Sequence, residues 1–305
     1  MIDIHTHLHF KDYDADRDEV IARAKDASVE KMILVGTDLA TSRAAVELAE
    51  KHDFLFASVG VHPHAIDELG IMNQESGSPA IIHDSQFTIH TTENEGIQEL
   101  MRDLKNIALS SNKVIAIGEC GLDYFSRDSE VPVPDGRKAF QRERFLVQLE
   151  IAREKGLPTI IHTRPSKGSM DAYDDVFEIL SDPEIADRGS KFVLHCYQGD
   201  TEVTKKFLEL PNTYFSFAGS VTYPVKKALI GTKDDPAQVL DLIPAERLFA
   251  ETDCPYLSPQ PVRGTRNEPA YVRYTIGSVA TEKSVSSETL DVTIRKTFDR
   301  VFSRS

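Results

Sequence analysis

Two histidines stand two positions apart at the start of the chain, in the stretch MIDIHTHLHF, a spacing that can hold a metal ion. Side chains i and i+2 of a β-strand lie on one face, so His5 and His7 would point the same way. Ile2 and Ile4 would then face the other side. Paired imidazoles at a strand end favour metal ligation, whereas a lone histidine there could equally be a polar strand end or a catalytic base. His9 falls where the alternation fails, so we do not expect it to bind metal.

Further groups of this kind end five later apolar runs. The motifs are VGVHPH, IGECGLDY, IIHTRP, LHCYQG and ETDCPY, and their polar residues include His62, His64, Glu119, His162, Arg164, His195, Glu251 and Asp253. Catalytic groups of barrel enzymes gather at the carboxyl ends of strands, so these side chains are expected to meet. Four histidines and two carboxylates are enough for two metal ions if one carboxylate bridges them, and Asp253 could also take a proton from bound water.

The pattern of apolar residues predicts the elements that would carry these groups. Eight β-branched, apolar runs cover residues 2–5, 32–36, 54–61, 114–118, 158–162, 192–195, 213–217 and 247–250. Longer stretches with helical periodicity separate them, such as QRERFLVQLEIAREKGLP. Eight strands alternating with helices predict an α/β fold, a (β/α)8 TIM barrel. A doubly wound open sheet is the alternative, but no glycine-rich dinucleotide turn follows the first run.

The whole chain is expected to form one domain with two insertions. These span residues 68–94 and 223–236, and both follow a predicted strand, so both should lie at the carboxyl face of the barrel. His83 and His90, in the first insertion, are expected to be surface histidines. We place Glu119 at the end of the fourth strand and Asp123 in the loop after it.

Composition narrows the class of protein. The 305 residues carry 35 basic and 49 acidic side chains, a net charge of −14, which argues against a protein that coats nucleic acid with a basic face. A phosphate could still be drawn locally into a metal site. No run of eighteen apolar residues and no signal peptide is apparent. Three cysteines without a CxxC motif indicate a reducing environment, so we expect a cytoplasmic protein with no membrane association.

These motifs together resemble the TatD family of metal-dependent deoxyribonucleases, within the amidohydrolase-like barrel hydrolases. The matching stretches are DIHTHLHF, VGVHPH, IGECGLDY, IIHTRP, LHCYQG and ETDCPYLSPQPVRGTRNEPAYV, in order from residue 3 to residue 272. The resemblance implies 3′–5′ exonuclease action on DNA, at single strands or 3′ ends. It also implies two divalent metal ions, which could be Mg²⁺, Mn²⁺ or Zn²⁺. Some relatives are assigned deacylation of D-aminoacyl-tRNA.

The resemblance also implies a set of ligands. One metal would be held by His5, His7, Glu119 and Asp253, and the other by Glu119, His162 and His195. Glu119 would bridge the two ions, and Asp253 and Glu119 would act in catalysis. The sequence departs from the family at His9, where an acidic or amide residue is usual. Cysteines directly follow three of the expected ligands, and strand alternation should turn the first two, Cys120 and Cys196, away from the barrel lumen.

Substrate contacts are expected from the loops at the same face. The candidates for contact with substrate phosphate are His62, His64, Arg164, Arg263, Arg266 and Asn267. Guanidinium groups match phosphate oxygens in a bidentate way, although the arginines could instead pair with local acids such as Glu268. Tyr124 and Phe125 could stack on a base or pack in the core.

Two other readings remain open on the sequence alone. The same barrel could hydrolyse an amide, lactone or ester, but many amidohydrolases bridge their metals with a lysine on the fourth strand, and this strand has none after Lys113. Aminoacyl-ester cleavage remains an alternative, because a bridging glutamate could also support that reaction. A reading of a different class is a non-catalytic metal-binding module that binds partners.

Overall fold

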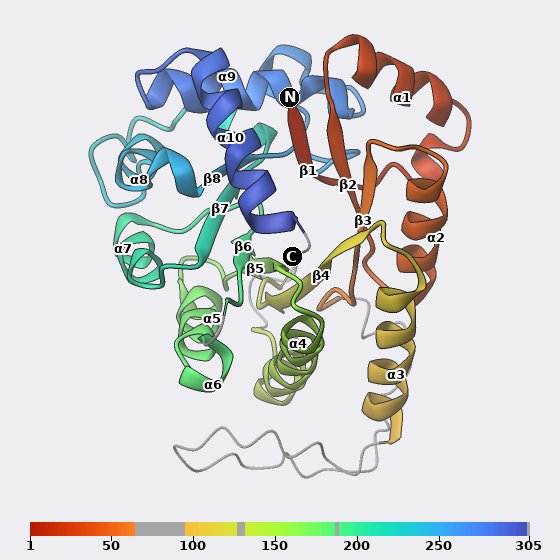
Figure 1. Cartoon of the computed structure of the whole chain (residues 1–305). Helices are drawn as coiled ribbons and strands as arrows, with labels where there is room; N and C mark the ends of the chain where they lie inside the picture. Colours follow the sequence, from red (N-terminus) through yellow and green to blue (C-terminus); the bar gives the residue numbers. More distant parts are fainter. Residues whose placement is uncertain (65–94, 127–131, 187–188, 304–305) are drawn as a thin grey trace.

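Eight parallel strands form the centre of the computed structural model, which describes residues 1–64, 95–126, 132–186 and 189–303 (Figure 1). Each strand pairs with the next along the chain, in the order β1 to β8. The strands are β1 Ile2–Thr6, β2 Lys31–Val35, β3 Leu55–Val59, β4 Val114–Asp123, β5 Thr159–Arg164, β6 Phe192–Leu194, β7 Thr213–Phe217 and β8 Leu248–Ala250. The segment after β8 returns to β1 through a parallel bridge between Thr6 and Cys254. The predicted TIM barrel is therefore confirmed.

Helices surround the barrel, most of them between successive strands (Figure 1). They are α1 Arg17–Asp26, α2 Leu39–Glu50, α3 Glu95–Ser110, α4 Asp135–Lys155, α5 Asp171–Leu180, α6 Pro183–Ala186, α7 Thr201–Glu209, α8 Pro236–Leu242, α9 Val272–Glu282 and α10 Ser287–Phe302. Short 3-10 turns add η1 Lys11–Tyr13, η2 Gly219–Thr222, η3 Ala245–Arg247, η4 Gln260–Val262 and η5 Pro269–Tyr271. Local signals set the boundaries: Asp38 and Thr41 form a capping box at the start of α2, and left-handed Gly156 ends α4.

The fourth strand continues further than the sequence predicts, and this places a buried carboxylate near the site. Pairing between β4 and β5 runs on to Asp123 and Arg164, so the expectation that Asp123 lies in a loop is wrong. All ten residues of β4 are buried, and Glu119 lies inside the strand rather than at its end.

Two glycines allow β5 to come close to β4 at this point. Gly118 and Gly121 both have φ +140°, a backbone conformation that residues with a side chain rarely adopt. A Cβ at these positions would collide with the backbone carbonyls of Ile160 and His162. The glycines therefore let the strand carrying Glu119 lie directly against the strand carrying His162.

The two predicted insertions have different outcomes. All of residues 68–94 and the preceding three positions lie outside the described residues, and so do His83 and His90. Residues 223–235 form an irregular, mostly exposed connection between η2 and α8. Among the helices that the structure describes, none has the length and apolar character needed to cross a membrane.

Candidate metal centre

The paired histidines of the first strand lie together in the mouth of the barrel. The two Nε2 atoms of His5 and His7 are 3.3 Å apart, and both side chains are buried. The Nδ1 of His7 donates to the carbonyl of Val35 at 2.7 Å, because a carbonyl can only accept. In neutral His7 the lone pair is then on Nε2 and faces His5. Such an arrangement of imidazole nitrogens suits a cation near both.

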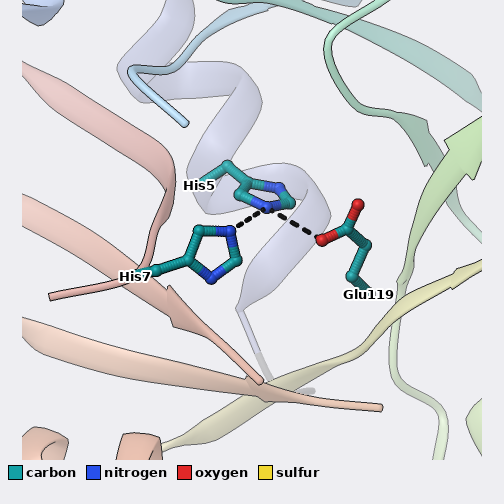
Figure 2. Close-up of side chains that lie close together, drawn as sticks. All are labelled: His5, His7 and Glu119. Atoms are coloured by element: carbon teal, nitrogen blue, oxygen red, sulfur yellow. Dashed lines mark hydrogen bonds and ion pairs between the residues drawn. The ribbon is translucent and has the colours of Figure 1, made fainter. Parts of the chain in front are cut away.

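Glu119 lies between this pair and two further histidines, His162 in β5 and His195 directly after β6. Its Oε2 lies 3.4 Å from Nε2 of His5, and its Oε1 lies 2.8 Å from Nδ1 of His162 and 2.9 Å from Nε2 of His195. Figure 2 shows Glu119 pointing toward His5, with His7 on the other side of His5. The two carboxylate oxygens therefore face different histidines, one group on each side of Glu119.

Asp253 closes the cluster from the segment after β8. Its Oδ1 is 3.4 Å from Nε2 of His7 and 3.7 Å from Nε2 of His5. The backbone of Asp253 has φ +54°, and its N–H donates to the carbonyl of His5 at 2.9 Å. This bond fixes the loop to β1 and aims the carboxylate at the histidine pair.

The electrostatics of the cluster favour ionised carboxylates. Burial alone would raise the pKa of Glu119, but the facing imidazoles of His195, His62 and His162 hold it well below its usual value. Burial likewise opposes ionisation of Asp253, and its histidine neighbours, His7 first among them, bring its pKa below the usual value. The site therefore presents anionic oxygens among imidazole nitrogens, a donor set that suits zinc, manganese or other transition metals.

The donor atoms are close enough to share ions. Among the described residues, four overlapping groups have their ligand atoms within 4.8 Å of one another: His5, His7 and Glu119; His5, His195 and Asp253; Glu119, His162 and His195; and His62, Asp123 and His162. All six predicted ligands thus lie in one cluster. Nδ1 of His5 is buried and has no hydrogen-bond partner among the residues that the structure describes, whereas its Nε2 faces the polar atoms of the site. The residues present fit the metal centre that the resemblance implies.

Two acidic residues outside the predicted ligand set, Glu251 and Asp3, hold the ligands in place. The sequence analysis assigned neither of them a role. Glu251 accepts from Nδ1 of His195 at 3.0 Å and from the Cys196 N–H at 2.8 Å, which leaves Nε2 of His195 facing Glu119. Asp3 accepts from the Thr252 N–H and hydroxyl at 2.9 and 2.6 Å, joining β1 to the end of β8. The sequence contains one indication for Asp3: it stands two residues before His5, so in a strand its side chain lies on the same face as His5 and His7.

The VGVHPH motif brings two further imidazoles to the edge of the cluster. Nδ1 of His62 accepts from the backbone N–H of His64 at 3.0 Å, so the proton of neutral His62 is on Nε2. That Nε2 lies 3.6 Å from Oε1 of Glu119. Burial lowers the pKa of His62 to about 3, and the group is neutral at physiological pH. His62 is therefore placed as an N–H donor that faces the centre.

His9 lies near the cluster but belongs to none of the possible metal-ligand groups among the described residues. Its ring centroid is 6.1 Å from that of His7 and 4.8 Å from that of Phe10, and neither ring nitrogen has a hydrogen-bond partner in the described part of the chain. We predict that His9→Asn keeps the metal content of the purified protein near that of the wild type, because no donor atom of the cluster is lost. Elemental analysis per chain checks this, with His7→Asn as the matched variant. Loss of a full metal equivalent from His9→Asn would overturn the assignment.

The expected substrate residues fall into two groups. Arg164 stacks on Phe125, with its guanidinium carbon 3.8 Å from the ring centroid, and Arg263 stacks on Tyr223 at 4.3 Å. Neither arginine forms an ion pair with a residue that the structure describes. Both are exposed, so their guanidinium groups are accessible to a ligand.

Arg266 and Asn267 have other partners, and the structure does not support their expected contact with substrate. Arg266 forms a bidentate pair with Asp16 at 2.6 and 2.9 Å. Asn267 has no exposed surface, and its amide donates to the carbonyls of Thr252 and Tyr256 at 2.9 and 2.6 Å. Arg266 therefore pairs with a local acid, which was the alternative considered for the arginines. The hydrogen bonds of Asn267 hold the loop after β8 in place.

Of the remaining predictions near the site, two concern packing. Tyr124 is buried, and its hydroxyl donates to Asp175 at 2.6 Å, so it packs in the core rather than stacking on a base. The side chain of Cys120 is buried, with its sulfur 3.9 Å from the carbonyl of Ile160. This contact with the neighbouring strand gives Cys120 a packing role.

A parallel eight-stranded barrel with a histidine–carboxylate cluster at the carboxyl ends of its strands defines a metal-dependent hydrolase of the TIM-barrel type. The sequence profile of the family described as TatD related DNase matches residues 2–303. The chain therefore belongs to the TatD family, and the resemblance seen in the sequence is confirmed.

Relatives along the full length agree with this class. The uncharacterized metal-dependent hydrolase YabD of Bacillus subtilis is 34% identical over 302 residues, covering 99% of this chain and 98% of that protein. The 3′–5′ ssDNA/RNA exonuclease TatD of Klebsiella pneumoniae is 32% identical over 295 residues, covering 95% and 93%. The crystal structure of YjjV, a TatD homolog from Escherichia coli, matches with a TM-score of 0.77 at 21% identity, covering 100% and 98%. The last likeness concerns the fold alone.

Proposed function

We propose that this chain is a deoxyribonuclease that removes nucleotides from the 3′ end of single-stranded DNA with two divalent metal ions. The observation that carries the proposal is the placement of Glu119. One of its oxygens faces His5 at 3.4 Å, and the other faces His162 and His195 at 2.8 and 2.9 Å. A carboxylate in this position can bridge two cations. A pair of cations is an arrangement suited to hydrolysis of a phosphodiester bond.

The proposed ligands follow the two sides of Glu119. His5, His7, Glu119 and Asp253 would hold one ion, and Glu119, His162 and His195 the other. Bound cations would supply Lewis-acid activation of the phosphodiester and of the attacking water. Asp253 is the proposed general base, and its carboxylate accepts the proton of that water. Its lowered pKa keeps this carboxylate ionised at neutral pH.

His62 is proposed to orient the scissile phosphate. The His64 N–H occupies Nδ1 of His62 and so keeps the remaining proton on Nε2, directed at the centre. An imidazole with its inward nitrogen protonated cannot ligate a metal through that atom, but it can donate to a phosphate oxygen. This distinguishes His62 from the four histidines that are proposed to bind metal.

Arg164 and Arg263 are the proposed cations for the substrate backbone. Their stacking on aromatic rings fixes the guanidinium planes without neutralising them. With a net charge of −14, the protein repels polyanions at long range, so two arginines without an ion-pair partner among the described residues should contribute strongly to binding.

The test is release of nucleotides from a single strand carrying one label at either end. With Mg²⁺ or Mn²⁺ present, the 3′-labelled strand should yield labelled mononucleotide at once, whereas the 5′-labelled strand should shorten stepwise. A chelator should stop both reactions. Cleavage of an aminoacyl ester by a protein that leaves the labelled strands intact would contradict the proposal and favour the aminoacyl-ester reading.

We predict that Arg263→Ala raises KM for the single strand by about tenfold while changing kcat little, since a contact of equal strength in ground and transition states contributes to binding alone. Arg266→Ala is the matched control. Its guanidinium is already paired with Asp16, so KM should stay within about twofold of the wild type by the same logic. Steady-state kinetics of the two variants decide this. A larger KM effect at Arg266 than at Arg263 would refute the assignment.

A further inference from the structure

Asp123 is a buried residue whose carboxylate contacts the proposed metal ligand His162, on the side of the ring opposite Glu119. It is the last residue of β4 and is 1% exposed. Its Oδ2 lies 3.2 Å from Nε2 of His162 and 2.8 Å from Nε2 of His64, and its Oδ1 accepts from the Phe125 N–H at 2.9 Å. Every one of these contacts requires the carboxylate to accept.

The contact with His162 decides which of its ring nitrogens can bind metal. Nδ1 of His162 faces Oε1 of Glu119 at 2.8 Å, on the side of the cluster. A neutral imidazole carries one proton, and a ligating nitrogen must be free of it. When a cation lies beside Glu119, the Asp123 carboxylate at Nε2 holds the one proton there and leaves the lone pair on Nδ1 for the cation.

The backbone around Asp123 keeps this carboxylate in place. The side-chain amide of Gln141 accepts from the Asp123 N–H at 2.8 Å and donates to its carbonyl at 2.9 Å. Gly121, two residues earlier, lets β4 approach the His162 backbone closely. Asp123 and His162 therefore lie on adjacent, tightly held strands.

We propose that Asp123 is a positioning residue for the second metal site: it fixes the tautomer and ring orientation of His162, so that Nδ1 presents its lone pair beside Glu119. This role rests on the proposed metal centre. Outer carboxylates of this kind typically contribute about 10- to 100-fold to metal affinity. His64 is the exposed end of the same chain of contacts, with a side chain 48% exposed, and its loss leaves the Asp123–His162 contact intact.

Titration of the metal-free protein with Zn²⁺ by calorimetry tests the proposal. Asp123→Asn keeps the shape but replaces the carboxylate by an amide, which can donate to Nε2 and move the proton to Nδ1. We expect one of two metal equivalents to bind about 10- to 100-fold more weakly and the other to be unchanged. His64→Ala should leave both within about threefold, since the contact between Asp123 and His162 persists.

Nitrogen NMR of ¹⁵N-histidine-labelled, zinc-loaded protein gives a second measurement that a purely structural role would not change. The wild type should show the His162 proton on Nε2, and Asp123→Asn should shift it toward Nδ1. Asp235→Asn is the matched control, a buried aspartate that caps α8 away from the ligands, and it should alter neither measurement. Asp123→Ser serves if the asparagine variant does not fold.

The outcomes separate the two proposals. If His162→Ala leaves zinc binding unchanged, the proposed metal centre itself is wrong, and the role of Asp123 fails with it. If His162→Ala weakens one equivalent but Asp123→Asn keeps wild-type affinity and tautomer, the positioning role alone is overturned. A uniform loss of both equivalents in Asp123→Asn, with the His162 tautomer unchanged, would also overturn it.

Discussion

Replacing Glu119 by alanine is expected to bring nuclease activity to background and to lower the occupancy of both metal sites together. The carboxylate faces His5 on one side and His162 and His195 on the other, so its loss removes a donor from both sides at once. The spacing of two cations depends on the group that bridges them, and refilling the sites with excess metal should not restore turnover. Metal content per chain and nucleotide release at saturating metal measure the two effects.

Variants of the histidines provide the control for this prediction. His162→Ala or His195→Ala removes a donor from one side of Glu119 and should mainly empty that side, leaving about one metal equivalent, because the donors on the other side stay in place. Two tightly held metals and normal turnover in Glu119→Ala would mean that the two-metal arrangement has to be abandoned.

Replacing Asp253 by asparagine should lower kcat by about 10²- to 10⁴-fold, the usual cost of losing a general base. The amide keeps the shape of the side chain but cannot accept a proton from water at neutral pH. Its oxygen can still face His7 and His5, which lie 3.4 and 3.7 Å from Oδ1 in the wild type, so the metal content should fall less than the rate.

Single-turnover rates with metal content measured on the same sample separate the two effects of this variant. Asp16→Asn is a suitable control, since this aspartate pairs with Arg266 outside the cluster and should leave the rate near that of the wild type. An Asp253→Asn protein that keeps both metals and more than half of its activity would exclude the proposed base.

The strand positions and the clustering of the ligands were predictable because they depend on local pattern. Apolar β-branched runs mark the strands, and parallel strands in a barrel bring their carboxyl ends to one face. The histidines at 5, 7, 162 and 195 therefore had to meet near Glu119 once eight strands were counted. The distances between them required the structure.

The misplaced groups depend on contacts between distant parts of the chain. Asp123 was expected in a loop, but β4 continues because Gly121 lets β5 pair with it to the end. Arg266 was expected at the substrate, but it meets Asp16, 250 residues earlier in the chain. The sequence indicates that a partner is possible and cannot indicate which acid the fold brings near.

The roles of Glu251 and His62 could not be predicted for a related reason. Glu251 was visible as an acid at the end of the last predicted strand, yet its contact with His195 depends on the register across β6, β7 and β8. The protonation pattern of His62 depends on one backbone N–H two residues away, which a loop conformation supplies. Such hydrogen bonds decide whether an imidazole ligates or donates.

An anomalous-difference map from crystals grown with Mn²⁺ tests the central claim most directly. We predict two peaks on opposite sides of Glu119, one contacting His5, His7 and Asp253, the other contacting His162 and His195. Both peaks should lie within bonding distance of the Glu119 carboxylate, one at each oxygen. A single peak, or two peaks of which either makes no contact with Glu119, would contradict the account.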